Sequence, residues 1–334
     1  MSFLATSAVL VGDHDLVMLD LDGVVYRGAD AVPGAAEALR GVADRGVALA
    51  YLTNNASRPA GVVAQHLRDL EMPLSDDAEV VTSAQAVATL MAERLGHGAR
   101  VLVVGGAGLR EALEAHDLVP VSDLDDDPVA VVQGFDPGIG WQQLAEASYA
   151  VAAGLPWFAS NTDLTVPTAR GIAPGNGSLV RAVSIATGRD PVVAGKPERP
   201  LFDETLGRTR AARPLMVGDR LDTDISGARA AGIASLWVAT GVHTLADVVA
   251  ANPDERPDLV GPDLSSLLTE HVEVEVEGVR ARCGDAAAEL TDGTIRLVHG
   301  EAGGLEALRA VVGLGWAVVD RGGPAPAVDD TMAT

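Results

Sequence analysis

The chain has 334 residues and 48% of them are apolar, so it can form two or three domains, each with its own hydrophobic core. A formal net charge of −23 repels nucleic acid phosphates and anionic lipids, which argues against a nucleic-acid-binding or membrane-binding protein. The single cysteine, Cys283, excludes an internal disulfide, and no apolar run is long enough to span a membrane or looks like a signal peptide, so we expect a cytoplasmic protein.

Strand-like and helix-like segments alternate from the start of the chain. The run DLVMLDLD at 15–22 is typical of a buried strand, and PGAAEALRGVADRG at 33–46 of a helix. A second strand, VALAYLTNN at 47–55, and a second helix, PAGVVAQHLRDLEM at 59–72, follow. This order predicts a parallel sheet with helices on both faces.

The alternation continues through the middle and later parts of the chain. Strands such as ARVLVVGG at 99–106 and PVAVVQGF at 128–135 predict a separate α/β unit. The first pattern resumes with PVVAGK at 191–196 and RPLMVGD at 213–219. We therefore predict an α/β fold in which a Rossmann-like parallel-sheet core, residues 1–82 and 189–269, is interrupted by an inserted α/β domain, residues 83–188.

The pattern changes after residue 270. The segments HVEVEVEGVRARC at 271–283 and AELTDGTIRLVHG at 288–300 show the alternation of half-buried strands, and the second contains the turn-forming TDGT. A helical GLEALRAVVGLG follows at 304–315. These segments predict a small β-rich module over residues 270–334, and they give no indication of its role.

The first strand ends in LDLDGVVYRG, which places Asp20 and Asp22 at the C-terminal edge of a parallel sheet. Ligands of open α/β sheets bind at that edge. Residues i and i+2 of a strand lie on the same side, so both carboxylates can face one site. Aspartate before glycine also opens ordinary turns, and alone this pair favours the turn.

Another predicted strand ends in Thr53, Asn54 and Asn55. These residues can offer a hydroxyl, an amide side chain and loop N–H groups to an anion. Taken by itself, such a segment is more often a helix cap.

Two later strands end at Lys196 and Asp219, and Asp222 and Asp224 lie just beyond. Each of these ends could also be a surface turn. Parallel strands place their carboxyl ends at one edge, however, so the four polar strand ends together indicate one shared site.

The composition of this predicted site favours a metal and a phosphate. Clustered carboxylates are costly unless a cation joins them, and hard oxygen ligands favour Mg²⁺. Lys196 is the single lysine among 24 basic residues. A compact ammonium suits phosphoryl oxygens and a nearby carboxylate where a planar guanidinium would fit badly.

In this order, the segments DLDGVVYRG, LTNNASR, GKP and VGDRLDTDI resemble the four motifs of the haloacid dehalogenase superfamily of phosphatases. The inserted segment ASNTDLTVPTARGIAPGNGS is similar to the type-two cap of the NagD and p-nitrophenylphosphatase branch. Within it, APGNGS at 173–178 is either a helix cap with a turn or a loop near the substrate. The similarity covers about residues 13–270, and the module behind it more loosely resembles that of actinobacterial glycerol 3-phosphate phosphatases.

The resemblance implies roles for the motif residues. Asp20 would be the nucleophile that forms an aspartyl-phosphate, and Asp22 the acid and then the base. Thr53 and the Asn54 amide would hold phosphate oxygens, with Asn55 beside them. Lys196 would steady the nucleophile and the phosphoryl charge.

The resemblance also implies a magnesium site. Mg²⁺ would be held by a carboxylate oxygen of Asp20, by the backbone carbonyl of Asp22 and by Asp219. Asp224 would lie next to these ligands without binding the ion itself. Val24 stands where the family often has threonine, but several members of the branch also carry valine.

These roles predict a magnesium-dependent phosphomonoester hydrolase for a small phosphorylated metabolite. Glycerol 3-phosphate is the first choice of substrate and 2-phosphoglycolate the second. A pyridoxal-phosphate or nucleotide phosphatase and a non-catalytic phosphometabolite-binding regulator are the alternatives. A homodimer formed through the cap domain is expected from the resemblance alone.

Overall fold

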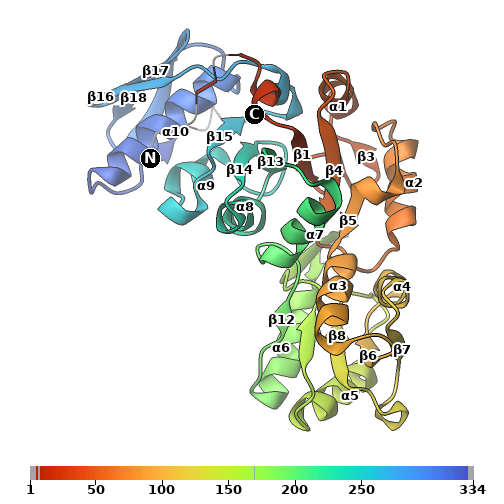
Figure 1. The fold of residues 1–334 in the computed structure, drawn as a ribbon. Helices are drawn as coiled ribbons and strands as arrows, with labels where there is room; N and C mark the ends of the chain where they lie inside the picture. Colours follow the sequence, from red (N-terminus) through yellow and green to blue (C-terminus); the bar gives the residue numbers. More distant parts are fainter. Residues whose placement is uncertain (1–4, 7, 169, 330–334) are drawn as a thin grey trace. The chain divides into compact units, whose positions relative to one another are not determined.

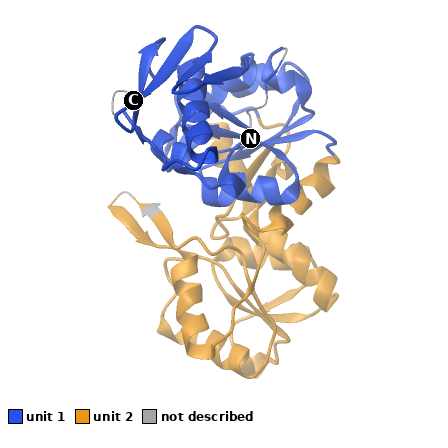
Figure 2. Cartoon of the chain, turned by 90° about the vertical axis from the view of Figure 1, so that its left-hand side faces the viewer, with its two compact units in different colours: residues 1–49, 70–73, 211–334 blue, residues 50–69, 74–210 orange. Residues whose placement is uncertain are grey.

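The computed structural model describes residues 5–6, 8–168 and 170–329 (Figure 1). The chain forms two compact units (Figure 2). Unit 1 takes the described residues of 1–49, 70–73 and 211–334, and unit 2 takes those of 50–69 and 74–210. The boundaries expected after residues 82, 188 and 269 divide the chain differently and stay a prediction.

The central sheet of unit 1 is parallel, with the strand order β15-β14-β13-β1. Residues 16–19 of β1 are fully buried, as expected for a parallel strand that is covered on both faces. Strand β4 begins in this unit, where the Ala48 amide donates to the Asp15 carbonyl at 3.2 Å. The elements before the module are η1 (Leu10–Asp13), β1 (Leu16–Asp20), β2 (Tyr26–Arg27), β3 (Asp30–Ala31), α1 (Ala35–Ala43), β4 (Ala48–Thr53), β13 (Pro214–Gly218), η4 (Leu221–Ile225), α8 (Ser226–Ala231), β14 (Ala234–Val238), α9 (Leu245–Ala250), η5 (Pro253–Glu255), β15 (Leu259–Gly261) and η6 (Leu264–Leu268).

The C-terminal module, residues 270–329, is part of unit 1 and combines one sheet with one helix (Figure 1). Alternate residues of β17 are buried, because one face of the sheet packs on α10. The predicted turn is a two-residue loop in which Asp292 and Gly293 both have positive φ, at 51° and 77°. Its elements are β16 (Val274–Glu277), β17 (Arg280–Cys283), β18 (Ala286–Thr291), β19 (Thr294–His299), α10 (Leu305–Asp320) and β20 (Ala327–Val328).

Unit 2 contains a second parallel sheet, with the strand order β12-β9-β8-β6-β7. Helices α5 and α6 pack on it through a buried apolar cluster that includes Val131, Val151 and Val180. In the same unit β4 pairs in parallel with β5. The further elements of unit 2 are α2 (Ala60–Asp69), η2 (Asp77–Glu79), β5 (Val80–Thr82), α3 (Ser83–Leu95), β6 (Arg100–Val104), α4 (Ala107–Ala115), β7 (Val119–Val121), η3 (Leu124–Asp126), β8 (Ala130–Gln133), α5 (Trp141–Ala152), β9 (Trp157–Ala159), β10 (Thr165–Thr168), β11 (Gly171–Pro174), α6 (Asn176–Thr187), β12 (Val192–Val193) and α7 (Arg199–Thr209).

The predicted fold class is confirmed. The structure has a parallel-sheet core, a further α/β sheet from the middle of the chain and a C-terminal β-rich sheet. Within the part of the chain that the structure describes, no helix combines the length and the apolar character that crossing a membrane requires.

Candidate active site

Three aspartates of unit 1 meet at one point of the structure. Asp20, Asp219 and Asp224 each offer a carboxylate oxygen, and these oxygens all lie within 4.8 Å of one another. Asp219 and Asp224 are 0% and 1% exposed, whereas Asp20 is partly exposed. The predicted meeting of Asp20 with Asp219 is therefore present in the structure.

The sheet and the loop after it account for this meeting. Strands β1 and β13 are parallel neighbours, with Leu19 opposite Val217, so the residues that end them share one edge. The π-helical turn η4 then brings Asp224 back toward that edge. Asp224 Oδ2 accepts a hydrogen bond from the Arg220 amide at 3.1 Å, which holds the carboxylate in this turn. π-helical turns are frequent at functional sites.

Asp219 is closely enclosed by backbone. Its Oδ2 accepts a hydrogen bond from the Val242 amide at 2.6 Å. A Cβ at Gly23, which has φ +92°, would lie 2.8 Å from the same oxygen, and a Cβ at Gly241 would overlap it. Glycine at both positions lets the loops after β1 and β14 approach the carboxylate, and it fixes where that carboxylate points.

These carboxylates fit a magnesium ion. Two of the three are buried, and holding them this close is costly without a cation between them. Oxygen ligands of this kind are the ones that Mg²⁺ prefers. Asp224 was expected to lie next to the ligands without binding the ion itself, yet one of its oxygens lies within 4.8 Å of an oxygen of Asp20 and of Asp219.

Two other aspartates of the motifs lie apart from this group. Asp22 is exposed and its carboxylate does not belong to it, so its expected contribution to the metal through the backbone carbonyl stays a prediction. Asp222 pairs with Arg220 through two hydrogen bonds, at 3.1 and 2.7 Å. Burial raises the pKa of Asp222, but the hydrogen bond and charge of Arg220 outweigh it and hold that pKa below its ordinary value.

The other predicted site residues belong to unit 2. The Asn54 side chain binds both backbone groups of Lys196: its Oδ1 accepts from the Lys196 amide at 2.8 Å, and its Nδ2 donates to the Lys196 carbonyl at 3.0 Å. The Thr53 hydroxyl accepts from the Asn55 amide at 3.0 Å. The Asn55 side chain in turn accepts from the Ser57 amide and hydroxyl. The structure thus brings together Asn54 and Lys196, while Asn55 organises a local turn.

Sequence reasoning missed three residues that support Asn54. The Asn161 amide donates to the Asn54 carbonyl at 2.6 Å, and the Asn176 amide donates to the Asn161 carbonyl at 2.7 Å. Asn54 also donates to the Asp163 carboxylate, at 3.2 Å to Oδ2. Asn161 and Asn176 are nearly completely buried. Asn161 follows shortly after the end of β9, which is the same strand-end signal that identified the other motifs.

The APGNGS segment, residues 173–178, packs against the loop that contains Asp163. The Gly177 amide donates to the Asp163 carbonyl at 2.8 Å, and the Gly175 amide donates to the Leu164 carbonyl at 2.9 Å. Asn176 then begins α6. Of the two readings of this segment, these bonds favour the helix cap with a turn.

We expect Gly195→Ala to weaken both folding and catalysis. A Cβ there would lie 2.5 Å from the Ser160 carbonyl oxygen and 2.7 Å from Asn54 Oδ1, so the Asn54 contact with Lys196 must shift. The expected cost is about 1–3 kcal/mol of unfolding free energy. Denaturant unfolding and phosphatase kinetics measure the two effects.

Gly207→Ala is the matched control for this substitution. Gly207 lies within α7, and a Cβ there meets no atom within 4 Å. Alanine should stabilise the helix by up to about 1 kcal/mol. Equal stability and equal activity of the two variants would contradict a tight fit at Gly195.

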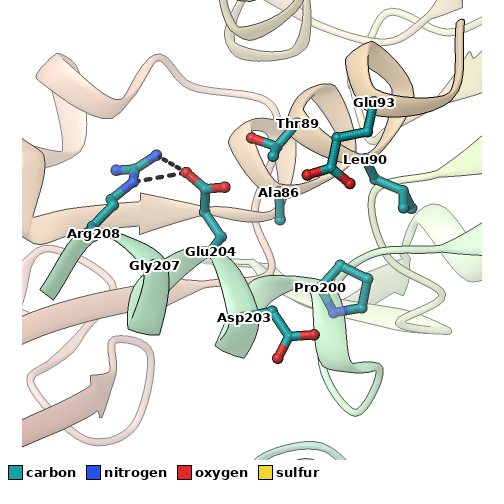
Figure 3. Close-up of a pocket in the computed structure, with 9 residues that line it drawn as sticks. All are labelled: Ala86, Thr89, Leu90, Glu93, Pro200, Asp203, Glu204, Gly207 and Arg208. Atoms are coloured by element: carbon teal, nitrogen blue, oxygen red, sulfur yellow. Dashed lines mark hydrogen bonds and ion pairs between the residues drawn. The ribbon is translucent and has the colours of Figure 1, made fainter. Parts of the chain in front are cut away.

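A cavity of about 350 Å³ lies between helices α3 and α7 of unit 2 (Figure 3). Glu93 and Thr89 line it from α3, and the Glu204–Arg208 ion pair lines it from α7. No residue of the predicted site lines this cavity. The carboxylate group of unit 1 therefore remains the candidate site.

Two family models match the chain, one in its first part and one in its later part. A model of the haloacid dehalogenase-like hydrolases matches residues 17–119, and a HAD-hydrolase-like model matches residues 193–267. D-glycerol 3-phosphate phosphatase from Mycobacterium tuberculosis is 49% identical over 255 residues, which are 76% of this chain and 71% of that protein. The chain belongs to the haloacid dehalogenase-like hydrolases. The resemblance seen in the four motifs is thereby confirmed.

Solved structures of this hydrolase family agree. Glycerol phosphate phosphatase from Mycobacterium tuberculosis, solved in complex with calcium, has a TM-score of 0.84 and 41% identity, and the match covers 96% of this chain and 94% of that one. The same protein has been solved in complex with magnesium, with a TM-score of 0.82, 42% identity and coverage of 95% and 93%. p-Nitrophenyl phosphatase from Archaeoglobus fulgidus has a TM-score of 0.71 and 27% identity, covering 77% of this chain and 98% of its own. The expected branch of the family is confirmed.

Proposed function

We propose that the chain is a magnesium-dependent phosphomonoester hydrolase whose substrate is glycerol 3-phosphate. The observation that carries the proposal is the near-half identity to D-glycerol 3-phosphate phosphatase across three quarters of the chain. The group formed by Asp20, Asp219 and Asp224 supports the metal dependence, because it supplies the oxygen ligands that magnesium needs.

Two aspartates of the first motif carry the proposed chemistry. A carboxylate oxygen of Asp20 attacks phosphorus, the bond from phosphorus to the ester oxygen breaks, and Asp22 gives its proton to the leaving alcohol. Asp22 then takes a proton from water, whose oxygen attacks the same phosphorus. The bond from phosphorus to Asp20 breaks, and inorganic phosphate leaves. The exposure of Asp22 suits this proton exchange with alcohol and water.

The remaining motif residues hold and neutralise the phosphoryl group. A magnesium ion bound at Asp20, Asp219 and the Asp22 carbonyl, with the Asp224 carboxylate beside them, would supply positive charge to the phosphoryl oxygens. Thr53 and the Asn54 backbone amide bind those oxygens, and the Lys196 ammonium lowers the cost of their negative charge. The support for these roles is that the two family models cover all of these residues, the first over residues 17–119 and the second over residues 193–267.

The test is phosphate release by the purified full-length chain. Glycerol 3-phosphate, 2-phosphoglycolate, pyridoxal phosphate, a nucleoside monophosphate and a sugar phosphate are compared with magnesium chloride or with EDTA. We expect kcat/KM for glycerol 3-phosphate to exceed the others by at least about 10-fold, and EDTA to abolish it. A higher kcat/KM for another ester would show that glycerol 3-phosphate is not the preferred substrate. Binding of an ester without any hydrolysis would favour a regulator instead.

Two further expectations belong to this proposal. The single cysteine supports a cytoplasmic location, and its side chain is buried. Three exposed apolar side chains on α5 and α6 of unit 2, Trp141, Tyr149 and Ile185, support a homodimer formed through the inserted domain, because contact with a second copy would bury them.

A further inference from the structure

One buried apolar core joins the C-terminal module to the loop that carries two of the three site aspartates. We call residues 219–225 the acidic loop. Leu221 and Ile225 of this loop belong to the same continuous cluster as Trp237 of β14 and the inward side of α10. The α10 residues of that cluster are Ala307, Leu308, Ala310, Val311, Val312, Leu314 and Trp316.

Trp237 links this core by a hydrogen bond to Asp219, one of the three clustered aspartates. Its side chain is 0% exposed, and its indole Nε1 donates to the backbone carbonyl of Asp219 at 3.0 Å. The Asp219 carboxylate is held separately by the Val242 amide. The backbone at Asp219 is thus positioned by an aromatic side chain of the shared core.

On the opposite side of the core, α10 is held against α9 and Arg256 by several close contacts. Trp316 of α10 donates from its indole nitrogen to the Val248 carbonyl of α9 at 2.8 Å. The Arg256 guanidinium lies 5.1 Å from the Trp316 ring centre and pairs with Asp320 at 2.7 Å. A Cβ at Gly315 would lie 2.6 Å from a methyl carbon of Val249. A close-packed interface of this kind transmits a displacement because it has no free space to absorb it.

We propose that the C-terminal module positions the acidic loop for metal binding. Through α10 and the shared core it fixes Trp237, and Trp237 holds the backbone of Asp219. Trp237 and Gly315 are therefore positioning residues that act on magnesium affinity without touching the ion or the substrate. This inference rests on the proposed function, since that function makes Asp219 a metal ligand.

Two substitutions in the full-length chain test the inference. Trp237→Phe keeps an aromatic ring, although a smaller one, and removes the N–H donor. Gly315→Ala places a methyl group against Val249 and pushes α10 away from α9. Magnesium binding is measured without substrate, by calorimetry and by the rise in Tm during titration with magnesium chloride. We expect each variant to bind magnesium about 3- to 30-fold more weakly. Its KM for the phosphate ester, measured at saturating magnesium, should change less than about 2-fold.

Trp157→Phe is the matched control. It is the same substitution at a buried tryptophan in the core of unit 2. The Trp157 indole nitrogen has no hydrogen-bond partner within the described part of the chain, so this variant loses aromatic packing without losing a hydrogen bond. This variant should lose stability but bind magnesium as the wild type does. If Trp237→Phe and Gly315→Ala also lower Tm while leaving magnesium affinity unchanged, the module only stabilises the fold and the inference is wrong.

The outcomes separate this inference from the proposed function. Wild-type protein that binds magnesium but hydrolyses no ester would contradict the proposed function, and the comparison of magnesium affinities would still decide the role of the module. Wild-type protein that binds no magnesium would overturn both.

Discussion

Replacing Asp20 with asparagine should lower phosphate release by at least about 10⁴-fold. The amide oxygen is a weak nucleophile, so the aspartyl-phosphate cannot form. The substitution also removes one of three clustered negative charges, which relieves repulsion between the carboxylates. We therefore expect a folded, inactive protein, and steady-state release of inorganic phosphate together with thermal unfolding measures both properties.

Asp44→Asn is the matched control for this substitution. Asp44 is exposed at the end of α1 and lies outside the carboxylate group, so its variant should keep wild-type activity. Rapid denaturation of the wild type during turnover, followed by mass spectrometry, should find phosphate on the peptide that carries Asp20. Substantial activity in Asp20→Asn would contradict Asp20 as the nucleophile. Phosphate found on another residue would identify that residue as the nucleophile instead.

The parts of the fold that were predictable from sequence are those with a local pattern. A sheet that packs on one face alternates buried and exposed residues, and this alternation revealed the C-terminal module. A parallel strand such as β1 is buried on both faces and shows no alternation. A continuous apolar run that ends in a polar residue therefore predicted this strand. Because β1 and β13 are parallel neighbours, the meeting of Asp20 and Asp219 followed from their positions at the strand ends.

The parts that were not predictable depend on contacts between distant segments. Asn54 contacts Lys196 and Asp163, which are 142 and 109 positions away, and a hydrogen bond of that range leaves no periodic trace in the sequence. The turn that brings Asp224 to the other carboxylates is a π turn, which a helical pattern does not distinguish from an α turn. Trp237 reads as an ordinary apolar strand residue, since its polar atom matters only once Asp219 lies beside it.

Lys196→Arg should lower kcat by about 100- to 1,000-fold although the charge is kept. Lys196 is 2% exposed, and its backbone is held on both sides by Asn54. A guanidinium is broader than an ammonium and its donors lie in a fixed plane, so it cannot take the same position in this enclosed space. The bonds from Asn54 go to the backbone and survive the substitution, so the fold should persist. Phosphate release and Tm measure the two expectations.

Arg199→Lys is the reverse substitution three residues away and serves as the control. The Arg199 side chain is 56% exposed and pairs with Asp203 along α7, so either cation should serve there and activity should stay within about 2-fold of wild type. Every other basic residue of the chain is an arginine, which makes the pair a direct test of why position 196 differs. If Lys196→Arg were as active as Arg199→Lys, position 196 would need only a positive charge. The shape of the ammonium group would then not explain why position 196 is a lysine.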